Sequence, residues 1–257
     1  MTLDVKRIWN ACGEAFDSYT TASDSFADNI ERPAIQQLIG DIDGARLLDL
    51  GCGSGTYSVS FAEQGGEVVA LDLSATMISL AQERAHGCGV EVDCRVADIR
   101  EPLPFGDAEF DIVFTATALH YVDDIGEFMK EAARVMKPSA RLIASVLHPM
   151  STAQFPLAAS EQVDVPDPWE GWYFGSPHRS IETPWLGFGA VSTEGRRIFC
   201  HHHTLADYFS ALKSARLSIT DMLEPAPSSE FALKNASRYD QAIRVPVFLI
   251  FKAEKIT

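Results

Sequence analysis

The sequence is short of positive charge and of long apolar runs. It carries 21 Lys and Arg residues against 36 Asp and Glu residues, a formal net charge of −15. A nucleic-acid partner is therefore not expected, because neutralising phosphates requires clustered Lys and Arg. An anionic membrane surface is disfavoured for the same reason. No apolar run approaches the roughly 20 residues that a membrane span needs, and the N-terminus lacks the apolar segment of a signal peptide.

The sequence is also short of cysteine. Its five cysteines are odd in number, widely spaced and without a Cys-x-x-Cys pair. This pattern indicates reduced thiols in a cytoplasmic protein. Cys52 lies inside a glycine-rich loop, where we expect a small residue that fills a tight turn, with a reactive thiol as the alternative. The 257 residues, 46% of them apolar, are enough for one large domain with a substantial core.

The most informative stretch is residues 47–55, Leu-Leu-Asp-Leu-Gly-Cys-Gly-Ser-Gly. An apolar run ends in an acid and is followed by a loop with three glycines. A second apolar run that ends in an acid, residues 68–72, follows about twenty residues later. Together they indicate a nucleotide-type ligand across the carboxyl ends of two parallel strands. The dinucleotide fingerprint G-x-G-x-x-G would need glycine at 56, where this sequence has Thr56.

The rest of the chain alternates between strand and helix patterns, which predicts right-handed crossovers and a parallel sheet. Strands are expected at 46–50, 67–71, 90–96, 110–115, 141–146, 217–223 and 245–253. Helices are expected at 56–64, 74–85, 125–136 and 204–215. Residues 1–45 have helical, polar-aromatic character. Residues 149–196 are rich in proline and hold three of the four tryptophans, which favours an ordered insertion over a disordered linker.

The spacing Asp49-x-Gly-x-Gly-x-Gly resembles the S-adenosylmethionine loop of class I methyltransferases. The resemblance is strong over residues 40–147 and holds only in outline elsewhere. It implies an α/β fold, the three-layer α/β/α sandwich of Rossmann-like methyltransferases, with a mostly parallel seven-stranded sheet whose last strand is antiparallel. We expect a single domain over 1–257, with 1–45 as a helical cap and 149–196 as a substrate lid.

The same resemblance implies S-adenosylmethionine as the cofactor and assigns residues to it. Asp49 is expected at the ammonium group, Asp72 at the ribose hydroxyls and Asp98 at the adenine amine, while backbone amides at the next helix favour the carboxylate. Thr115 is placed beneath the sulfonium or simply ends a strand, and Tyr19 closes over the methionine end or packs in the core. The expected cofactor-binding residues are Tyr19, Asp49, Gly51, Cys52, Gly53, Gly55, Asp72, Leu73, Met77, Asp98, Ile99 and Thr115.

Two histidines are the candidates for a catalytic base. His148-Pro149 and His202-His203-Thr204 are similar to a subgroup of bacterial methyltransferases with His-Pro after the fifth strand and His-x-Thr before the following helix. The alternative for each histidine is a hydrogen-bonded scaffold role. No metal is expected, because neighbours in the run 201–203 point to opposite faces and zinc needs convergent ligands. Further acceptor contacts are expected from His120, Trp172, Tyr173, Arg179 and Trp185.

These features predict a cytoplasmic methyltransferase, a monomer or homodimer, that methylates a small molecule at O or N rather than C. Three alternatives stay open. An NAD(P)-dependent oxidoreductase shares the sheet but has the other glycine spacing. A non-catalytic S-adenosylmethionine-binding regulator would need no enclosed acceptor pocket, and a protein-methylating enzyme would need an open groove that the insertion is expected to block.

Overall fold

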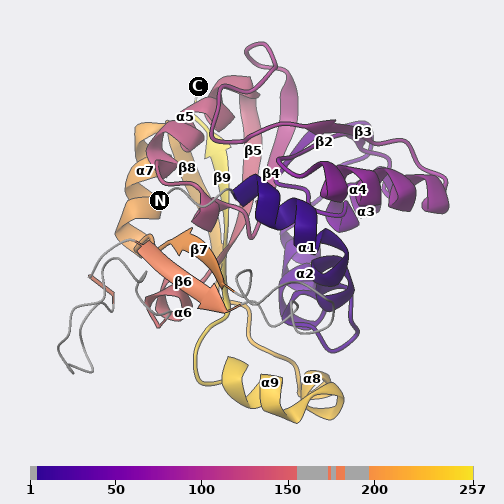
Figure 1. The fold of residues 1–257 in the computed structure, drawn as a ribbon. Coiled ribbons are helices and arrows are strands. Elements are labelled where there is room, and N and C mark those ends of the chain that lie inside the picture. Colours follow the sequence, from indigo (N-terminus) through magenta and orange to yellow (C-terminus); the bar gives the residue numbers. More distant parts are fainter. Residues whose placement is uncertain (1–4, 155–172, 175–177, 183–196, 257) are drawn as a thin grey trace.

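A seven-stranded sheet lies at the centre of the protein, with helices packed against both faces (Figure 1). The structure is a computed structural model that describes residues 5–154, 173–174, 178–182 and 197–256. The sheet order is β3-β2-β1-β4-β5-β9-β8. Its strands are β1 (Arg46–Leu50), β2 (Glu67–Asp72), β3 (Asp93–Val96), β4 (Phe110–Ala116), β5 (Met136–Leu147), β8 (Leu217–Leu223) and β9 (Phe248–Lys255).

The helices and the remaining strands complete three layers. The helices are α1 (Val5–Thr20), the π-helix η1 (Ala27–Glu31), α2 (Arg32–Ile39), α3 (Thr56–Glu63), α4 (Ala75–Cys88), the 3₁₀-helix η2 (Leu119–Tyr121), α5 (Ile125–Val135), α6 (Pro149–Ala153), α7 (Leu205–Ser214), α8 (Ser229–Lys234) and α9 (Ala236–Ala242). A separate antiparallel pair is formed by β6 (His178–Glu182) and β7 (Arg197–His201).

The predicted sheet is confirmed. β1 pairs in parallel with β2 and β4, β2 with β3, and β4 with β5. The last strand, β9, runs antiparallel between β5 and β8. Leu47, Leu48 and Leu50 of β1 are fully buried, because β1 is covered on both faces, as parallel strands normally are.

Two apolar cores fill the spaces between the layers. On one face, α5 and α7 pack on the sheet through residues such as Met129 and Leu212. On the other face, α2, α3 and α8 bury Ile35, Phe61 and Phe231 against the sheet. The three-layer sandwich therefore follows from burial of both faces of one sheet.

Element boundaries differ from the prediction where local contacts compete with the strand pattern. Strand β3 begins at Asp93 rather than at 90, because Val90 N–H donates to Ala85 O and so ends helix α4. Strand β5 begins at Met136, before Pro138, and the register of its pairing with β4 shifts between Phe110 and Ile112. Pro138 thus lies at an irregularity in the pairing, where its missing N–H is tolerated.

Other differences lie near the C-terminus. The last strand begins at Phe248 rather than at 245. Helices α8 and α9 were not expected from the sequence. Each is short, and each begins with a side-chain cap, from Ser228 and Asn235 respectively.

Helix α1 lies across the carboxyl edge of the sheet and is fastened to α4 (Figure 1). The Asn10 side chain accepts a hydrogen bond from Ser74 Oγ at 2.8 Å. The Asp17 carboxylate pairs with Arg84 at 2.5 Å and accepts a further hydrogen bond from Ser54 Oγ. These contacts hold α1 over the ends of the strands.

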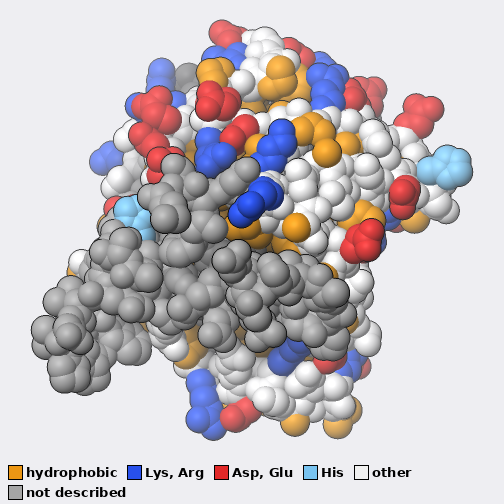
Figure 2. Space-filling model, viewed as in Figure 1, with side chains coloured by type: hydrophobic (Ala, Val, Ile, Leu, Met, Phe, Trp, Pro, Cys, Tyr) orange, Lys and Arg blue, Asp and Glu red, His pale blue; other side chains and the backbone are white. Residues whose placement is uncertain are grey.

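The face shown in Figure 2 carries acidic and basic side chains intermixed, with apolar side chains between them. The negative charge of the chain is therefore spread over this face together with compensating positive groups. Among the described residues, no helix is long and apolar enough to cross a membrane.

Substitution of Gly55 by alanine is expected to lower the free energy of unfolding by about 2 kcal/mol. Gly55 has φ +77°, and an added Cβ would lie 2.7 Å from Ala81 Cβ and 2.9 Å from its Cα. Gly87→Ala is the control, because Gly87 lies inside α4 with nothing within 4 Å of an added Cβ. Urea unfolding should show a gain of about 0.5–1 kcal/mol for Gly87→Ala. A Gly55→Ala protein as stable as the wild type would contradict the packing described.

Candidate functional site

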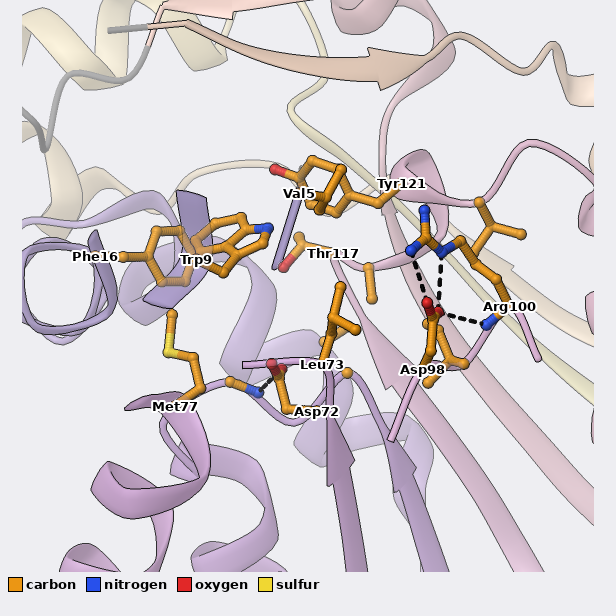
Figure 3. A pocket seen from close by; sticks show the side chains of 16 residues that line it. Val5, Trp9, Phe16, Asp72, Leu73, Met77, Asp98, Arg100, Thr117 and Tyr121 are labelled. Carbon is orange, nitrogen blue, oxygen red and sulfur yellow. Dashed lines mark hydrogen bonds and ion pairs between the residues drawn. The ribbon is translucent and has the colours of Figure 1, made fainter. Parts of the chain in front are cut away.

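A cavity lies where β1, β2 and β4 end at the carboxyl edge of the sheet, beneath α1 (Figure 3). We call it the loop cavity. In Figure 3, Leu73 lies between Asp72 on one side and the Asp98–Arg100 pair on the other. Its lining residues are Val5, Trp9, Phe16, Gly51, Gly53, Asp72, Leu73, Met77, Asp98, Ile99, Arg100, Ala116, Thr117, Ala118, Tyr121 and Val122.

The glycine loop between β1 and α3 lets the backbone come close to this cavity. Gly51 has φ +77°, and an added Cβ would lie 2.5 Å from Ala118 Cβ. The amides of Gly51 and Cys52 donate to Leu71 O at 2.8 and 2.9 Å, which fixes the loop to the end of β2. Burial raises the pKa of the Cys52 thiol well above its usual value, so Cys52 is a protonated small residue rather than a nucleophile.

Asp72 is held by the loop and by the start of α4. Gly53 N–H donates to its Oδ2 at 2.9 Å, and Ser74 N–H donates to its Oδ1 at 2.8 Å. Burial raises the pKa of this carboxyl group. Each carboxylate oxygen can accept a further hydrogen bond, so Asp72 is suited to bind two adjacent hydroxyl groups in the cavity.

Asp98 forms a planar pair with Arg100, a residue that the sequence analysis did not single out. Arg100 Nε and Nη2 donate to the Asp98 carboxylate at 2.9 and 2.6 Å. The guanidinium group lowers the pKa of Asp98. Both side chains line the loop cavity with Ile99 between them in the chain, so this wall offers an ion pair beside an apolar side chain.

Five predicted cofactor residues do not line the loop cavity: Cys52 and Gly55 of the glycine loop, and Asp49, Thr115 and Tyr19. Asp49 is buried beneath the loop and accepts a hydrogen bond from Ser58 Oγ at 2.5 Å. Thr115 is fully buried and lines neither this cavity nor its neighbour, because the chain meets the cavity one residue later, at Ala116. Tyr19 lines the neighbouring cavity, with the Arg238 guanidinium 4.9 Å from the centre of its ring.

The neighbouring cavity has a volume of about 660 Å³, and we call it the aromatic cavity. Four residues line both cavities and so mark the junction between them: Trp9, Phe16, Thr117 and Tyr121. The aromatic rings that line the aromatic cavity belong to Trp9, Phe16, Tyr19, Phe26, Tyr121 and Phe248. The wall is therefore mainly apolar, with a few polar groups.

Thr117 at the junction has an unusual backbone. Its φ of +51° is in the left-handed region, which a β-branched residue rarely adopts. Thr117 N–H donates to Ser145 O at 2.8 Å, and this bond helps to hold the strained residue. Such outliers concentrate at functional sites, which agrees with the position of Thr117 between the cavities.

Three buried polar residues line the aromatic cavity: Ser25, Glu31 and His120. Glu31, which is 2% exposed, accepts hydrogen bonds from Ser145 Oγ and, at 3.1 Å, from Tyr57 Oη. Burial raises the pKa of its carboxyl group. His120 is 3% exposed, and its Nδ1 atom has no hydrogen-bond partner in the part of the chain that the structure describes. Burial, with repulsion from His203 and His201, lowers the pKa of His120 to about 3, so its imidazole is neutral.

The two predicted base histidines have structural roles. Nδ1 of His148 accepts from Met150 N–H at 3.0 Å, so its proton is on Nε2, 2.7 Å from Glu224 Oε1. Nε2 of His202 lies 3.0 Å from Tyr173 O and must donate to it, which leaves Nδ1 to accept from Thr152 Oγ1 at 2.7 Å. Neither ring keeps a free nitrogen, so their predicted role as general bases gains no support.

Of the other predicted acceptor residues, one lines a cavity, two lie elsewhere and two are not described by the structure. His120 lines the aromatic cavity. Tyr173 Oη accepts from Leu205 N–H at the start of α7, and Arg179 is buried in β6, where Nη1 donates to His178 O. Neither of these two lines either cavity. Trp172 and Trp185 lie outside the described residues.

The sequence analysis missed several residues that line the two cavities. Trp9 and Phe16 are seven residues apart on α1, and this spacing places both on one face of a helix. Thr117 and Glu31 carry no recognisable motif. No sequence signal marks them, because their positions depend on contacts with distant strands.

The sheet order, the glycine loop and the cavity at the carboxyl edge define a class I, Rossmann-like methyltransferase fold. Residues 48–144 match the family model for the methyltransferase domain. This part of the chain is therefore similar to the methyltransferase domain family, in agreement with the resemblance of the glycine loop.

Individual relatives agree with this assignment. The chain is 32% identical over 166 residues to the biotin biosynthesis bifunctional protein BioHC of Cellvibrio japonicus, a match that covers 63% of this chain and 31% of that protein. It is 35% identical over 117 residues to the ubiquinone biosynthesis O-methyltransferase of Xylella fastidiosa, covering 46% of this chain and 47% of the relative. The matches thus span about a third to a half of the length of these curated relatives.

Among solved structures, a similar one is the S-adenosylmethionine-dependent methyltransferase from Mesorhizobium loti. It is 27% identical and superposes with a TM-score of 0.67, covering 87% of this chain and 97% of that one. The likeness therefore extends beyond residues 48–144 to most of the chain.

Asp49 is expected to make the ligand-free protein less stable as pH rises. Burial, with repulsion from Asp72, raises the pKa of Asp49 to about 7, above its unfolded value of about 4. Between these values the folded state holds the extra proton, so this group's contribution to the free energy of unfolding falls from about pH 4 to about pH 7. Urea unfolding at pH 5 and pH 8 should therefore show a smaller loss in Asp49→Asn than in the wild type. Equal losses in both proteins would contradict the pKa shift.

Proposed function

We propose that this protein transfers a methyl group from S-adenosylmethionine to a small-molecule acceptor. The loop cavity has the features that the cofactor requires. The Asp72 carboxylate has acceptor capacity for the ribose hydroxyls, and the glycine at 51 leaves room for close approach of the backbone. Leu73, Ile99 and Met77 provide apolar contacts for the adenine. The names of the relatives point to the same chemistry.

One observation carries the proposal: the two cavities share four lining residues. The cofactor supplies an electrophilic methyl group, and an in-line displacement needs the acceptor on the opposite side of that carbon. The aromatic cavity shares Trp9, Phe16, Thr117 and Tyr121 with the loop cavity, so an acceptor there lies next to the reacting end of the cofactor. An acceptor bound between these aromatic rings would displace water from the junction.

The aromatic cavity also bears on what the acceptor is. A volume of about 660 Å³ is within the range of small-molecule sites. A second cavity beside the loop cavity favours an enzyme over a regulatory protein that only binds the cofactor. We propose O or N as the methylated atom, since the cavity holds polar groups, Glu31 and His120, that can form hydrogen bonds with a proton-bearing acceptor.

We also propose a cytoplasmic location. All five cysteines are free, which supports this location.

Asp72→Ala is expected to weaken the binding of S-adenosylhomocysteine roughly 10- to 100-fold, because hydrogen bonds from the ribose hydroxyls to a charged acceptor are lost. Asp221→Ala, an exposed acid on β8 at the far edge of the sheet, is the control. Isothermal titration calorimetry would measure both variants. Unchanged affinity in Asp72→Ala would refute its role at the ribose. Failure of the wild type to bind either S-adenosylmethionine or S-adenosylhomocysteine at millimolar concentration would overturn the proposed function.

A further inference from the structure

The aromatic cavity contains one carboxyl group among its described lining residues, that of Glu31. The other charged residue of this lining, Arg238, is engaged elsewhere: its Nη1 donates to Asp24 O at 2.7 Å and lies 3.3 Å from Asp24 Oδ1. The described wall therefore offers an anionic acceptor no unmatched positive charge. It is suited to a neutral molecule with an apolar body.

Glu31 lies close to the junction. Its Oε1 accepts from Ser145 Oγ, and the backbone carbonyl of the same Ser145 accepts from Thr117 N–H at 2.8 Å. A single residue of β5 therefore separates the carboxyl group from the strained residue at the junction. An acceptor that reaches the junction from the aromatic cavity passes beside Glu31.

The surroundings of Glu31 are unusual for a residue with only a structural role. Among the described residues, its carboxyl group is hydrogen-bonded by two hydroxyl groups, Ser145 Oγ and Tyr57 Oη, and the neighbouring Arg32 pairs with Asp28 instead. Burying a carboxyl group without a bonded cation is costly. A carboxyl group whose proton affinity is raised in this way is suited to take a proton from a substrate.

His120 supplies a further buried polar group of the wall. Its buried Nδ1 atom has no partner among the described residues, although buried nitrogen atoms are nearly always hydrogen-bonded. Because the cavity is lined by this residue, a bound ligand with a hydroxyl or amine group would satisfy it. A neutral imidazole can donate or accept this bond.

We propose that the aromatic cavity binds a neutral, ring-bearing acceptor whose reacting hydroxyl or amine is hydrogen-bonded by His120 and loses its proton to Glu31. This inference rests on the proposed methyl transfer. As the acceptor O or N forms its bond to the methyl carbon, the carbon–sulfur bond breaks and its electron pair stays on sulfur. The proton of the acceptor passes to an ionised Glu31 oxygen, and the resulting carboxylic acid loses it to water after product release. Glu31 is thus a catalytic residue, and His120 binds the acceptor.

Glu31→Gln is the informative variant. Both partners of Glu31 are hydroxyl groups, which donate or accept, so glutamine can keep both hydrogen bonds while it can no longer take a proton. Glu63→Gln, an exposed glutamate on α3, is the matched control. Thermal melting and calorimetry with S-adenosylhomocysteine show whether each variant is folded and binds the cofactor product.

The acceptor probes are 2-naphthol and 2-methoxynaphthalene, which share a ring system but differ in the proton-bearing group. Fluorescence titration of the protein saturated with S-adenosylhomocysteine would measure their binding. We expect the wild type and Glu63→Gln to bind 2-naphthol at least about 10-fold more tightly than 2-methoxynaphthalene. A difference of this size is typical of a hydrogen bond to a charged group. This preference should fall at least about threefold in Glu31→Gln and in His120→Phe, with S-adenosylhomocysteine affinity unchanged within about threefold.

The outcomes separate the two proposals. If the wild type binds S-adenosylhomocysteine but does not discriminate between the probes, or if both variants keep the full preference, the assignment of Glu31 and His120 is overturned. If one variant is unfolded, the other decides the result. If the wild type does not bind S-adenosylhomocysteine, the proposed function itself fails.

Where 2-naphthol is methylated in the presence of S-adenosylmethionine, Glu31→Gln should lower kcat by about 100-fold or more. A kcat of Glu31→Gln within threefold of the wild-type value would overturn the catalytic role of Glu31.

Discussion

The loop after β1 and the segment after β4 approach each other so closely that glycine is required at position 51. An added Cβ there would lie 2.5 Å from Ala118 Cβ, and the backbone of Gly51 is left-handed. This close approach joins the ends of β1 and β4, and Thr117 and Tyr121 follow directly after β4. Both cavities and their junction depend on it, because the same segment forms a wall of each.

Helix α1 and the π-helix η1 complete these walls from the N-terminal part of the chain. Trp9 and Phe16 of α1 line the junction, and Asp17 of α1 forms an ion pair with Arg84 of α4. Glu31 ends the π-helix and is bonded to Ser145 of β5. π-Helical turns occur frequently at functional sites. Here the turn directs an acid from a surface layer into the centre of the protein.

Much of the fold follows from local sequence pattern. The run of apolar residues in β1, the glycines after it and the acid at the end of β2 predicted the parallel sheet and the ligand edge, because each signal lies within a few neighbouring residues. The resemblance of the glycine loop to that of methyltransferases assigned Asp72, Leu73 and Met77 to the cofactor, and all three line the loop cavity. Boundaries failed where a cap or an irregular pairing intervened, as at Val90 and Pro138.

The acceptor side could not be predicted in the same way, because its residues are defined by distant partners. Whether His148 is a base or a capping residue depends on Glu224, 76 residues away. Glu31 meets Ser145 across 114 residues and has no motif of its own. A histidine is chemically suited to act as a general base, which is why the sequence suggested this role for His148 and His202. In the structure, both ring nitrogens of each histidine form hydrogen bonds within the protein.

The central claim is that one ligand in the loop cavity presents its reacting centre to the aromatic cavity at Thr117. A crystal structure of the protein with S-adenosylhomocysteine tests it most directly. The account predicts both ribose hydroxyls on the Asp72 carboxylate and the sulfur atom at the junction beside Thr117 and Tyr121. A ligand bound outside the loop cavity, or with its sulfur directed away from the aromatic cavity, would contradict the account.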